Sequence, residues 1–219
     1  MADCNPCTTP MATRAKLRKE NDDLFDQPIL YRSIIGGLEY LTLSKPDLSF
    51  AVKQLSQFLQ VPTVAHWTAC KRVLRYVNGT LKHGILFTKE HFSIEAYADS
   101  DWAGDVNDRK STSGYYVCLG RNLVQWSSKK QKVVSLSSIE VEYKSLSQAA
   151  TELVWIQHLF EELGIEMNNT PMIWCDNMSV GALSSNPIFH ARTKHIEIDV
   201  HYVRELVTRK TLSVSICGF

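Results

Sequence analysis

The spacing of apolar residues changes between Gly79 and Ile94, and that change constrains the fold more than any other feature. Before Gly79, apolar residues recur at intervals of three and four, which is typical of amphipathic helices. From Ile94 they begin to alternate with polar residues, which is typical of strands with one buried face. We therefore expect a small helical segment followed by a domain that contains a sheet.

Turn residues place the boundary between these two parts near residues 79 to 90. The pairs Asn78-Gly79 and His83-Gly84 end the helical pattern. We predict a helical connection segment over 28–85, with three helices, and a second domain over 86–219. Residues 1–27 mix prolines with clustered charges and show no sustained period, so we expect a poorly ordered lead-in there.

The second domain carries the pattern of an α/β sheet protein. Ser137 and Glu140 form a capping box at the start of a long helix, which Gly164 ends. The expected elements are strands over 94–99, 114–119 and 123–134, a helix over 137–163, a strand over 172–175, a helix over 195–207 and a strand over 212–216. The second and third strands are joined as a hairpin. This order predicts a mixed five-stranded sheet with flanking helices, whose later connections are right-handed crossovers.

Composition narrows the class of protein. With 44% hydrophobic and 21% charged residues, the chain has the composition of an ordinary globular protein. No apolar run approaches the roughly 20 residues that span a bilayer, and the N-terminus lacks the zones of a signal peptide. We therefore expect an intracellular protein, cytoplasmic or nuclear, that does not bind membranes. The sequence carries no signal for its oligomeric state.

The six cysteines are scattered, so no disulfide framework is expected. Cys4 and Cys7 form one CxxC pair, but a zinc site requires a second pair of ligands at suitable spacing, and none follows. Two tryptophans, Trp126 and Trp174, lie within strand patterns, and we expect them to be core residues rather than platforms for stacking bases.

A basic stretch lies between Arg109 and Lys132. The net charge of the chain is only +1, so affinity for nucleic acid has to come from a local surface. This stretch contains no Asp or Glu, and its six cations are Arg109, Lys110, Arg121, Lys129, Lys130 and Lys132. It fits a surface that binds phosphates without reading sequence. The alternative is an ordinary solvated hairpin.

Three carboxylates carry the prediction of chemistry. On the long helix, positions 142, 146, 149, 153, 156 and 160 form one stripe, which is apolar except for Glu142. The alternative role for Glu142 is a partner of the helix dipole at a wet helix end. However, Asp99 and Asp176 each directly follow an apolar run that we predict to be a strand. Strand ends are where ligand sites form in such sheets.

Three converging acidic groups repel one another unless a cation lies between them. Hard oxygen ligands favour Mg²⁺ or Mn²⁺. Two such ions, roughly 3.5 to 4 Å apart, activate a water on one side of a phosphodiester and stabilise the leaving oxygen on the other. The pattern therefore predicts metal-dependent phosphodiester hydrolysis.

Several residue runs of the second domain resemble the ribonuclease H region of copia-type retrotransposon Pol polyproteins. These runs are Tyr97-Ala98-Asp99-Ser100-Asp101-Trp102-Ala103-Gly104-Asp105, Arg109-Lys110-Ser111-Thr112-Ser113-Gly114-Tyr115, Trp126-Ser127-Ser128-Lys129-Lys130-Gln131, Ser137-Ser138-Ile139-Glu140-Val141-Glu142-Tyr143, Asp176-Asn177 and Arg192-Thr193-Lys194-His195-Ile196-Glu197. Upstream, three further runs are similar to the segment that links the polymerase to that region: Tyr31-Arg32-Ser33, Lys45-Pro46-Asp47 and His66-Trp67 with Lys71-Arg72-Val73-Leu74-Arg75-Tyr76. The resemblance thus covers nearly the whole chain.

The resemblance implies a ribonuclease H-like fold and cleavage of the RNA strand of RNA/DNA hybrids with Mg²⁺ or Mn²⁺. It places the catalytic and metal-binding carboxylates at Asp99, Glu142 and Asp176. For contacts to nucleic acid we expect Arg109, Lys110, Lys129 and Lys130 at phosphates. Ser100 and Asn177, next to the carboxylates, are expected at the 2′-hydroxyls that distinguish RNA from DNA.

Two departures from the family pattern matter. The polymerase palm motif is absent, so no reverse transcriptase activity is expected. The family also continues past the last strand into a helix opened by an Ala-Asp pair, which resembles a fourth catalytic carboxylate. This chain ends at Phe219 instead, after a run that stops resembling the family near Val214. We expect a C-terminally truncated domain with weakened activity, or alternatively an inactive remnant that binds nucleic acid; His195, Glu197 and Asp199 are weaker candidates to replace the missing carboxylate.

Overall fold

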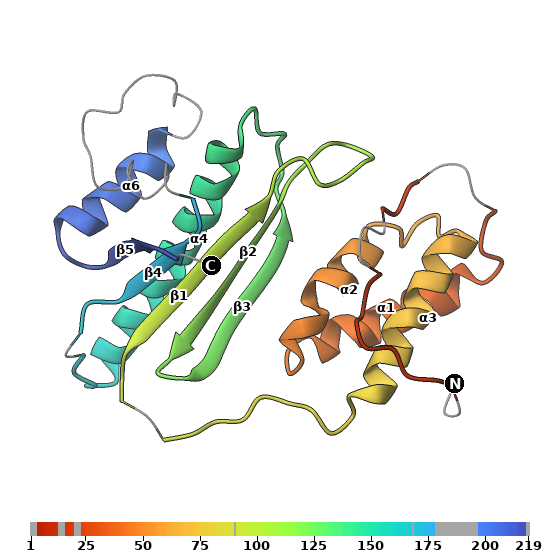
Figure 1. Ribbon diagram of the computed structural model, residues 1–219, viewed down its shortest axis with the longest axis horizontal. Coiled ribbons are helices and arrows are strands. Elements are labelled where there is room, and N and C mark those ends of the chain that lie inside the picture. Colours follow the sequence, from red (N-terminus) through yellow and green to blue (C-terminus); the bar gives the residue numbers. More distant parts are fainter. Residues whose placement is uncertain are drawn as a thin grey trace. The chain divides into compact units, whose positions relative to one another are not determined.

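The computed structural model describes residues 4–12, 16–19, 23–89, 91–167, 169–177 and 197–217. The chain divides into two compact units (Figure 1). The first comprises Met1–Ile85 with Asp105–Asp108, and the second comprises Leu86–Gly104 with Arg109–Phe219. Each unit has its own hydrophobic core. None of the described helices is long and apolar enough to cross a membrane.

The first unit is built from helices. The elements are α1 (Pro28–Leu41), the 3-10 helix η1 (Pro46–Leu48), α2 (Ser49–Ser56) and α3 (Val64–Gly79). Proline at the start of α1 and of η1 presets the helical φ and has no amide hydrogen to leave unpaired. The apolar faces enclose a core of Tyr31, Ile35, Leu38, Leu48, Ala51, Val52, Leu55, Cys70 and Val73. The three predicted helices are therefore confirmed.

The second unit contains the sheet. Its elements are β1 (Ile94–Asp101), β2 (Thr112–Leu119), β3 (Asn122–Lys130), α4 (Ser138–Glu162), β4 (Met172–Cys175), α6 (Glu197–Thr208) and β5 (Ser213–Ile216). The strand order is β3-β2-β1-β4-β5. The first three strands are antiparallel neighbours, whereas β4 is parallel to β1 and to β5. The predicted mixed five-stranded sheet with flanking helices is confirmed.

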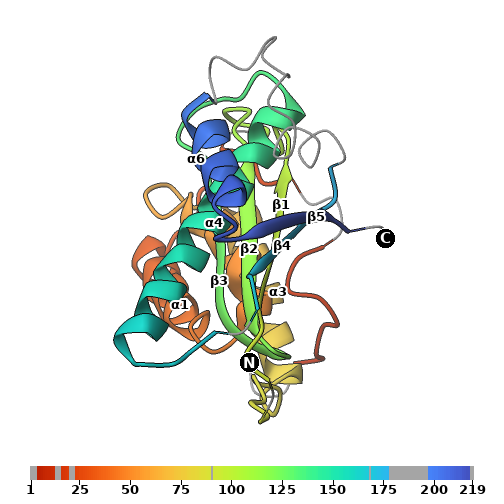
Figure 2. The same cartoon turned by 90° about the vertical axis from the view of Figure 1, so that its left-hand side faces the viewer.

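Helices α4 and α6 cover one face of this sheet (Figures 1 and 2). The apolar stripe of α4 is buried as its spacing predicted, with Leu146, Ala149 and Leu153 fully shielded from solvent. These side chains pack on the inward residues of the strands, among them Ala96 and Ile173. Gly164, with a left-handed φ of 67°, follows α4 and lets the chain turn away.

The two tryptophans do not lie in that core, so this part of the prediction is wrong. Trp174 is the cross-strand partner of Tyr97, and Trp126 that of Tyr116. Because Tyr97 alternates with the buried Ala96 and Ala98, this row points to the face opposite α4. The rings of Tyr97 and Tyr116 stack on each other, with centroids 4.6 Å apart. The ring of Tyr97 also stacks with that of Trp174, with centroids 6.4 Å apart.

The end of β3 and the start of α4 each differ from the prediction in one detail. Strand β3 ends at Lys130, four residues before the predicted end, because the next side chain, Gln131, turns inward. Its amide donates to the hydroxyl of Ser113, at 2.8 Å. Second, Ser137 caps the amide of Glu140, but the Glu140 carboxylate accepts from the amide of Leu136 and not from that of Ser137. The predicted helix start at His195 lies outside the described residues.

Candidate metal centre

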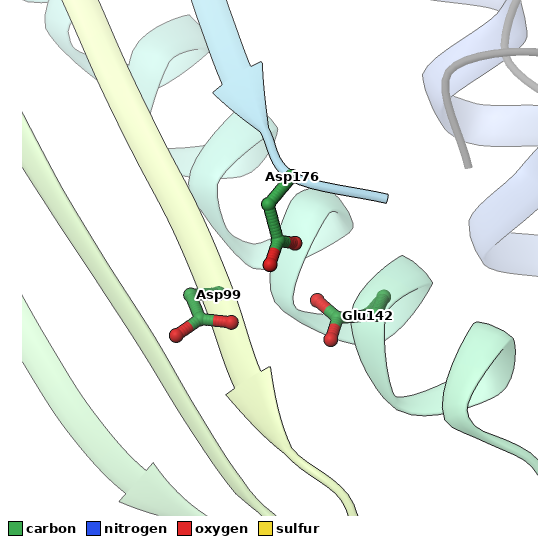
Figure 3. A group of neighbouring side chains, drawn as sticks. All are labelled: Asp99, Glu142 and Asp176. Atoms are coloured by element: carbon green, nitrogen blue, oxygen red, sulfur yellow. The ribbon is translucent and has the colours of Figure 1, made fainter. Parts of the chain in front are cut away.

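Three carboxylates from three different elements lie together at the carboxyl ends of strands β1 and β4 (Figure 3). Asp99 lies near the end of β1, and Asp176 directly follows β4. Because β1 and β4 are parallel, with Ala98 paired to Cys175, these two residues come next to each other. Glu142 reaches them from the beginning of α4, and each of the three offers an oxygen within 4.8 Å of the others.

The crowding of these groups perturbs Glu142. Burial, followed by the negative charges of Asp99 and Asp176, raises the pKa of Glu142 to about 7, while the neighbouring Ser100 hydroxyl opposes the rise. A carboxylate in such surroundings is unfavourable without a positive charge beside it. The site therefore carries an electrostatic penalty that a bound cation relieves.

The donor set fits a divalent metal ion. Within the described part of the chain, none of the three carboxylates forms a salt bridge with a lysine, arginine or histidine. Three carboxylates without nitrogen or sulfur ligands favour Mg²⁺ or Mn²⁺ over zinc or copper. Asp99, Glu142 and Asp176 are thus the residues that would hold such an ion.

A nearby carboxylate is excluded from this cluster. Asp101 lies two residues after Asp99 on the same face of β1, but its side chain accepts a hydrogen bond from the amide of Thr112. That contact fixes the start of β2 and leaves Asp101 outside the group of three.

Two polar residues predicted to contact substrate flank the carboxylates. The amide of Ser100 donates to the Asp99 carboxylate at 2.7 Å, which restrains the orientation of Asp99. Ser100 itself points towards α4, where its hydroxyl lies beside Glu142. Asn177 follows Asp176 and is half-buried. Both residues therefore belong to the immediate surroundings of the cluster.

Four of the predicted basic residues lie at the same end of the sheet as the carboxylates. Lys129 and Lys130 end β3 and pair with Ser113 and Thr112 at the start of β2. Lys110 and Arg109 lie two and three residues before the start of that strand. Arg121 instead lies in the turn between β2 and β3, at the opposite end of the ladder and roughly 24 Å away along the strands. The basic stretch is thus divided between the two ends of the hairpin.

A buried serine at the base of the site was not predicted from the sequence. Ser145, fully shielded from solvent, places its hydroxyl 2.8 Å from the carbonyl oxygen of Asp99 and 2.9 Å from that of Gly114. The only signal in the sequence is its position three residues after Glu142, on the same side of the helix. A buried polar residue there indicates a specific partner.

Comparisons with known proteins find similar sequences among the Pol polyproteins of transposons. No protein-family model matches the chain. Over 215 residues, 98% of its length, the chain is 48% identical to the retrovirus-related Pol polyprotein from transposon RE2 of Arabidopsis thaliana. It is 35% identical, again over 98% of its length, to the corresponding polyprotein from transposon TNT 1-94 of Nicotiana tabacum. It spans 15% and 17% of the lengths of these two proteins.

Among solved structures, the chain is similar to the N-terminal ribonuclease H domain of a Mycobacterium tuberculosis protein. The identity is 11%, the TM-score is 0.43, and the match covers 58% of this chain and 83% of the other.

Proposed function

The chain belongs to the family of retrovirus-related Pol polyproteins from transposons, and from this premise we propose that its second unit is a ribonuclease H-like nuclease. Its substrate is the RNA strand of an RNA/DNA hybrid. The observation that carries the proposal is the convergence of Asp99, Glu142 and Asp176, whose elements lie far apart in sequence. The resemblance of the surrounding residue runs to the ribonuclease H region of the family supports the same assignment.

Each carboxylate has a defined part in this proposal. Divalent ions, when bound at such a site, supply an activated water and stabilise the oxygen that leaves the phosphorus. Asp99 and Asp176 are exposed and face the substrate, whereas Glu142 is half-buried and lies on the side of the site next to α4. Because Glu142 holds a proton more firmly than an ordinary glutamate, its deprotonation and the binding of a cation favour each other.

The substrate contacts follow from the placement of the polar residues. Arg109, Lys110, Lys129 and Lys130 bind backbone phosphates at the end of the sheet where the carboxylates lie. Such contacts supply affinity without sequence preference. Ser100 and Asn177 are the groups next to the carboxylates that can hydrogen-bond to a 2′-hydroxyl, which only the RNA strand carries.

A cleavage assay with labelled nucleic acids tests the proposal. With Mg²⁺ present, we expect the chain to cut the RNA strand of a hybrid duplex and to leave single-stranded RNA and duplex DNA intact. Chelation with EDTA abolishes the cleavage. Cleavage that survives chelation contradicts the proposal, and hybrid binding without any cleavage reduces the role of the unit to nucleic-acid binding.

The proposed phosphate contacts predict a measurable salt dependence. Replacing Lys129 and Lys130 together by Gln is expected to lower the slope of log K against log salt by roughly 1 for each phosphate contact removed. Hybrid binding is followed by fluorescence anisotropy from about 50 to 200 mM salt. Arg121→Gln is the matched control, because it removes a cation from the far end of the same hairpin. An equal change of slope in this control contradicts the assignment.

A further inference from the structure

Ser145 lies where α4 crosses the end of β1. The residues around it on the helix, such as Val141, Leu146 and Ala149, are apolar and fully buried. A hydroxyl in such an interface is unfavourable unless it has a hydrogen-bond partner. Here the partners are the main-chain carbonyls of Asp99 and Gly114. The polar contact is thus built into the packing of the helix on the sheet.

The two carbonyls belong to one position in the sheet. Asp99 and Gly114 are direct partners across the antiparallel β1 and β2. Each carbonyl oxygen has two lone pairs, so it can accept from the serine and from a strand amide. The hydroxyl has one proton, which the two oxygens share. Ser145 is therefore hydrogen-bonded to the sheet at the Asp99–Gly114 pair, which carries the first carboxylate of the candidate site.

The Ser145 hydrogen bonds define the orientation of α4 on the sheet more sharply than apolar packing does. Hydrophobic contacts are non-directional, so they specify the rotation of α4 and its height along β1 less sharply than a hydrogen bond does. A hydrogen bond weakens steeply when its geometry changes. Glu142 is one turn before Ser145 on the same side of the helix. When Ser145 is held in place, the backbone of Glu142 is therefore held in place as well.

The site also needs such an anchor, because its carboxylates repel one another. Each of the three carboxylates has an oxygen within 4.8 Å of those of the other two. Repulsion between these like charges acts to separate the start of α4 from β1 when no cation is bound. At the same helix–sheet interface, Gln131 donates to the carbonyl of Val141 at 3.3 Å. The start of α4 is therefore held to the sheet by two polar contacts.

We propose that Ser145 is a positioning residue, which holds α4 at the rotation and height at which the Glu142 carboxylate meets those of Asp99 and Asp176. It touches neither metal nor substrate and acts through the backbone of Asp99. Its effect on metal affinity stands on the geometry alone, whereas its effect on cleavage rests on the proposed nuclease function.

The test uses the full chain with Mn²⁺ as the probe. We expect Ser145→Ala to weaken Mn²⁺ binding about tenfold, at the lower end of what is lost when residues that support metal ligands are replaced. Ser145→Thr, which keeps the hydroxyl, restores the affinity to within about twofold of the natural chain. Ser147→Ala is the matched control: Ser147 is a buried serine on the same helix, and its loss leaves the Asp99 contact intact. Binding is measured by the free Mn²⁺ signal in electron paramagnetic resonance.

Stability separates positioning from a merely structural role. The melting temperature without metal is measured for all variants, and we expect Ser145→Ala and Ser147→Ala to differ from the natural chain by similar small amounts. Unchanged Mn²⁺ affinity in Ser145→Ala overturns the inference. So does an affinity loss that Ser147→Ala shares or that Ser145→Thr fails to restore, and so does a natural chain that binds no Mn²⁺.

Cleavage measurements distinguish this inference from the proposed function. If Ser145→Ala weakens Mn²⁺ binding and no variant cleaves hybrid, the nuclease function fails and the positioning role stands. If the natural chain cleaves and Ser145→Ala cleaves with the same Mg²⁺ dependence and rate, the positioning role fails and the nuclease function stands.

Discussion

Replacing Asp99 by Asn is expected to reduce the rate of hybrid cleavage by about 10³-fold or more. The change removes one negative charge from the three carboxylates while keeping the shape of the side chain. Asp99 is exposed and its neighbours in β1 are held by the strand pairing, so the fold is expected to persist. The loss therefore reflects the site and not unfolding, which circular dichroism and the melting temperature check.

Glu95→Gln provides the matched control for this substitution. Glu95 lies on the same face of the same strand as Asp99, four residues earlier, and accepts a hydrogen bond from the indole of Trp174 at 2.9 Å. Gln keeps an acceptor there and removes the same charge. We expect cleavage by Glu95→Gln to stay near that of the natural chain. If both variants lose activity equally, or if Asp99→Asn remains active, the assignment of Asp99 is wrong.

Replacing Glu142 by Gln is expected to stabilise the metal-free protein at pH 8 and to leave its stability at pH 4 unchanged. The pKa of Glu142 rises from 4.5 to about 7 on folding. Because the folded pKa is the higher one, the folded state binds more protons than the unfolded state between these values, and stability falls as pH rises from 4.5 through 7. Above pH 7 the full penalty of the charged carboxylate is present, and Gln removes it.

The size of this effect is moderate because Glu142 is only half-buried. The pKa difference corresponds to about 3 kcal/mol, and solvent screening at a partly exposed group reduces this to about 1 to 2 kcal/mol. For a chain of this size, that is a rise in melting temperature of about 2 to 8 °C. Saturating Mg²⁺ reverses the order, since it stabilises the natural chain more than the variant. A variant that is less stable than the natural chain at pH 8 without metal contradicts the prediction.

The parts of the fold that depend on periodicity were predictable from the sequence. The stripe through Leu146, Ala149 and Leu153 fixed the buried face of α4, and Glu142 stood out because it is the one charged residue on that stripe. Asp99 and Asp176 were recognisable because each follows an apolar run, and parallel strands bring such positions to one edge. Local pattern and simple topology together were sufficient for these three residues.

Features that depend on particular tertiary contacts were not predictable. The alternation after Leu123 continues to Val134, yet β3 ends at Lys130, because Gln131 bonds to Ser113 and Val141. Likewise, strand alternation does not say which face a helix covers, so Trp126 and Trp174 were placed in the core. Ser145 was missed for the same reason: its role depends on two carbonyls that are remote in sequence.

The central claim is that Asp99, Glu142 and Asp176 form one site for divalent metal ions. The most direct test is anomalous X-ray scattering from crystals of the chain soaked in Mn²⁺. We expect an anomalous peak among the three side chains, about 2.1 Å from carboxylate oxygens, and its disappearance in Asp99→Asn crystals. Mn²⁺ bound elsewhere with no peak between these residues, or carboxylates that point apart in the crystal, would contradict the claim.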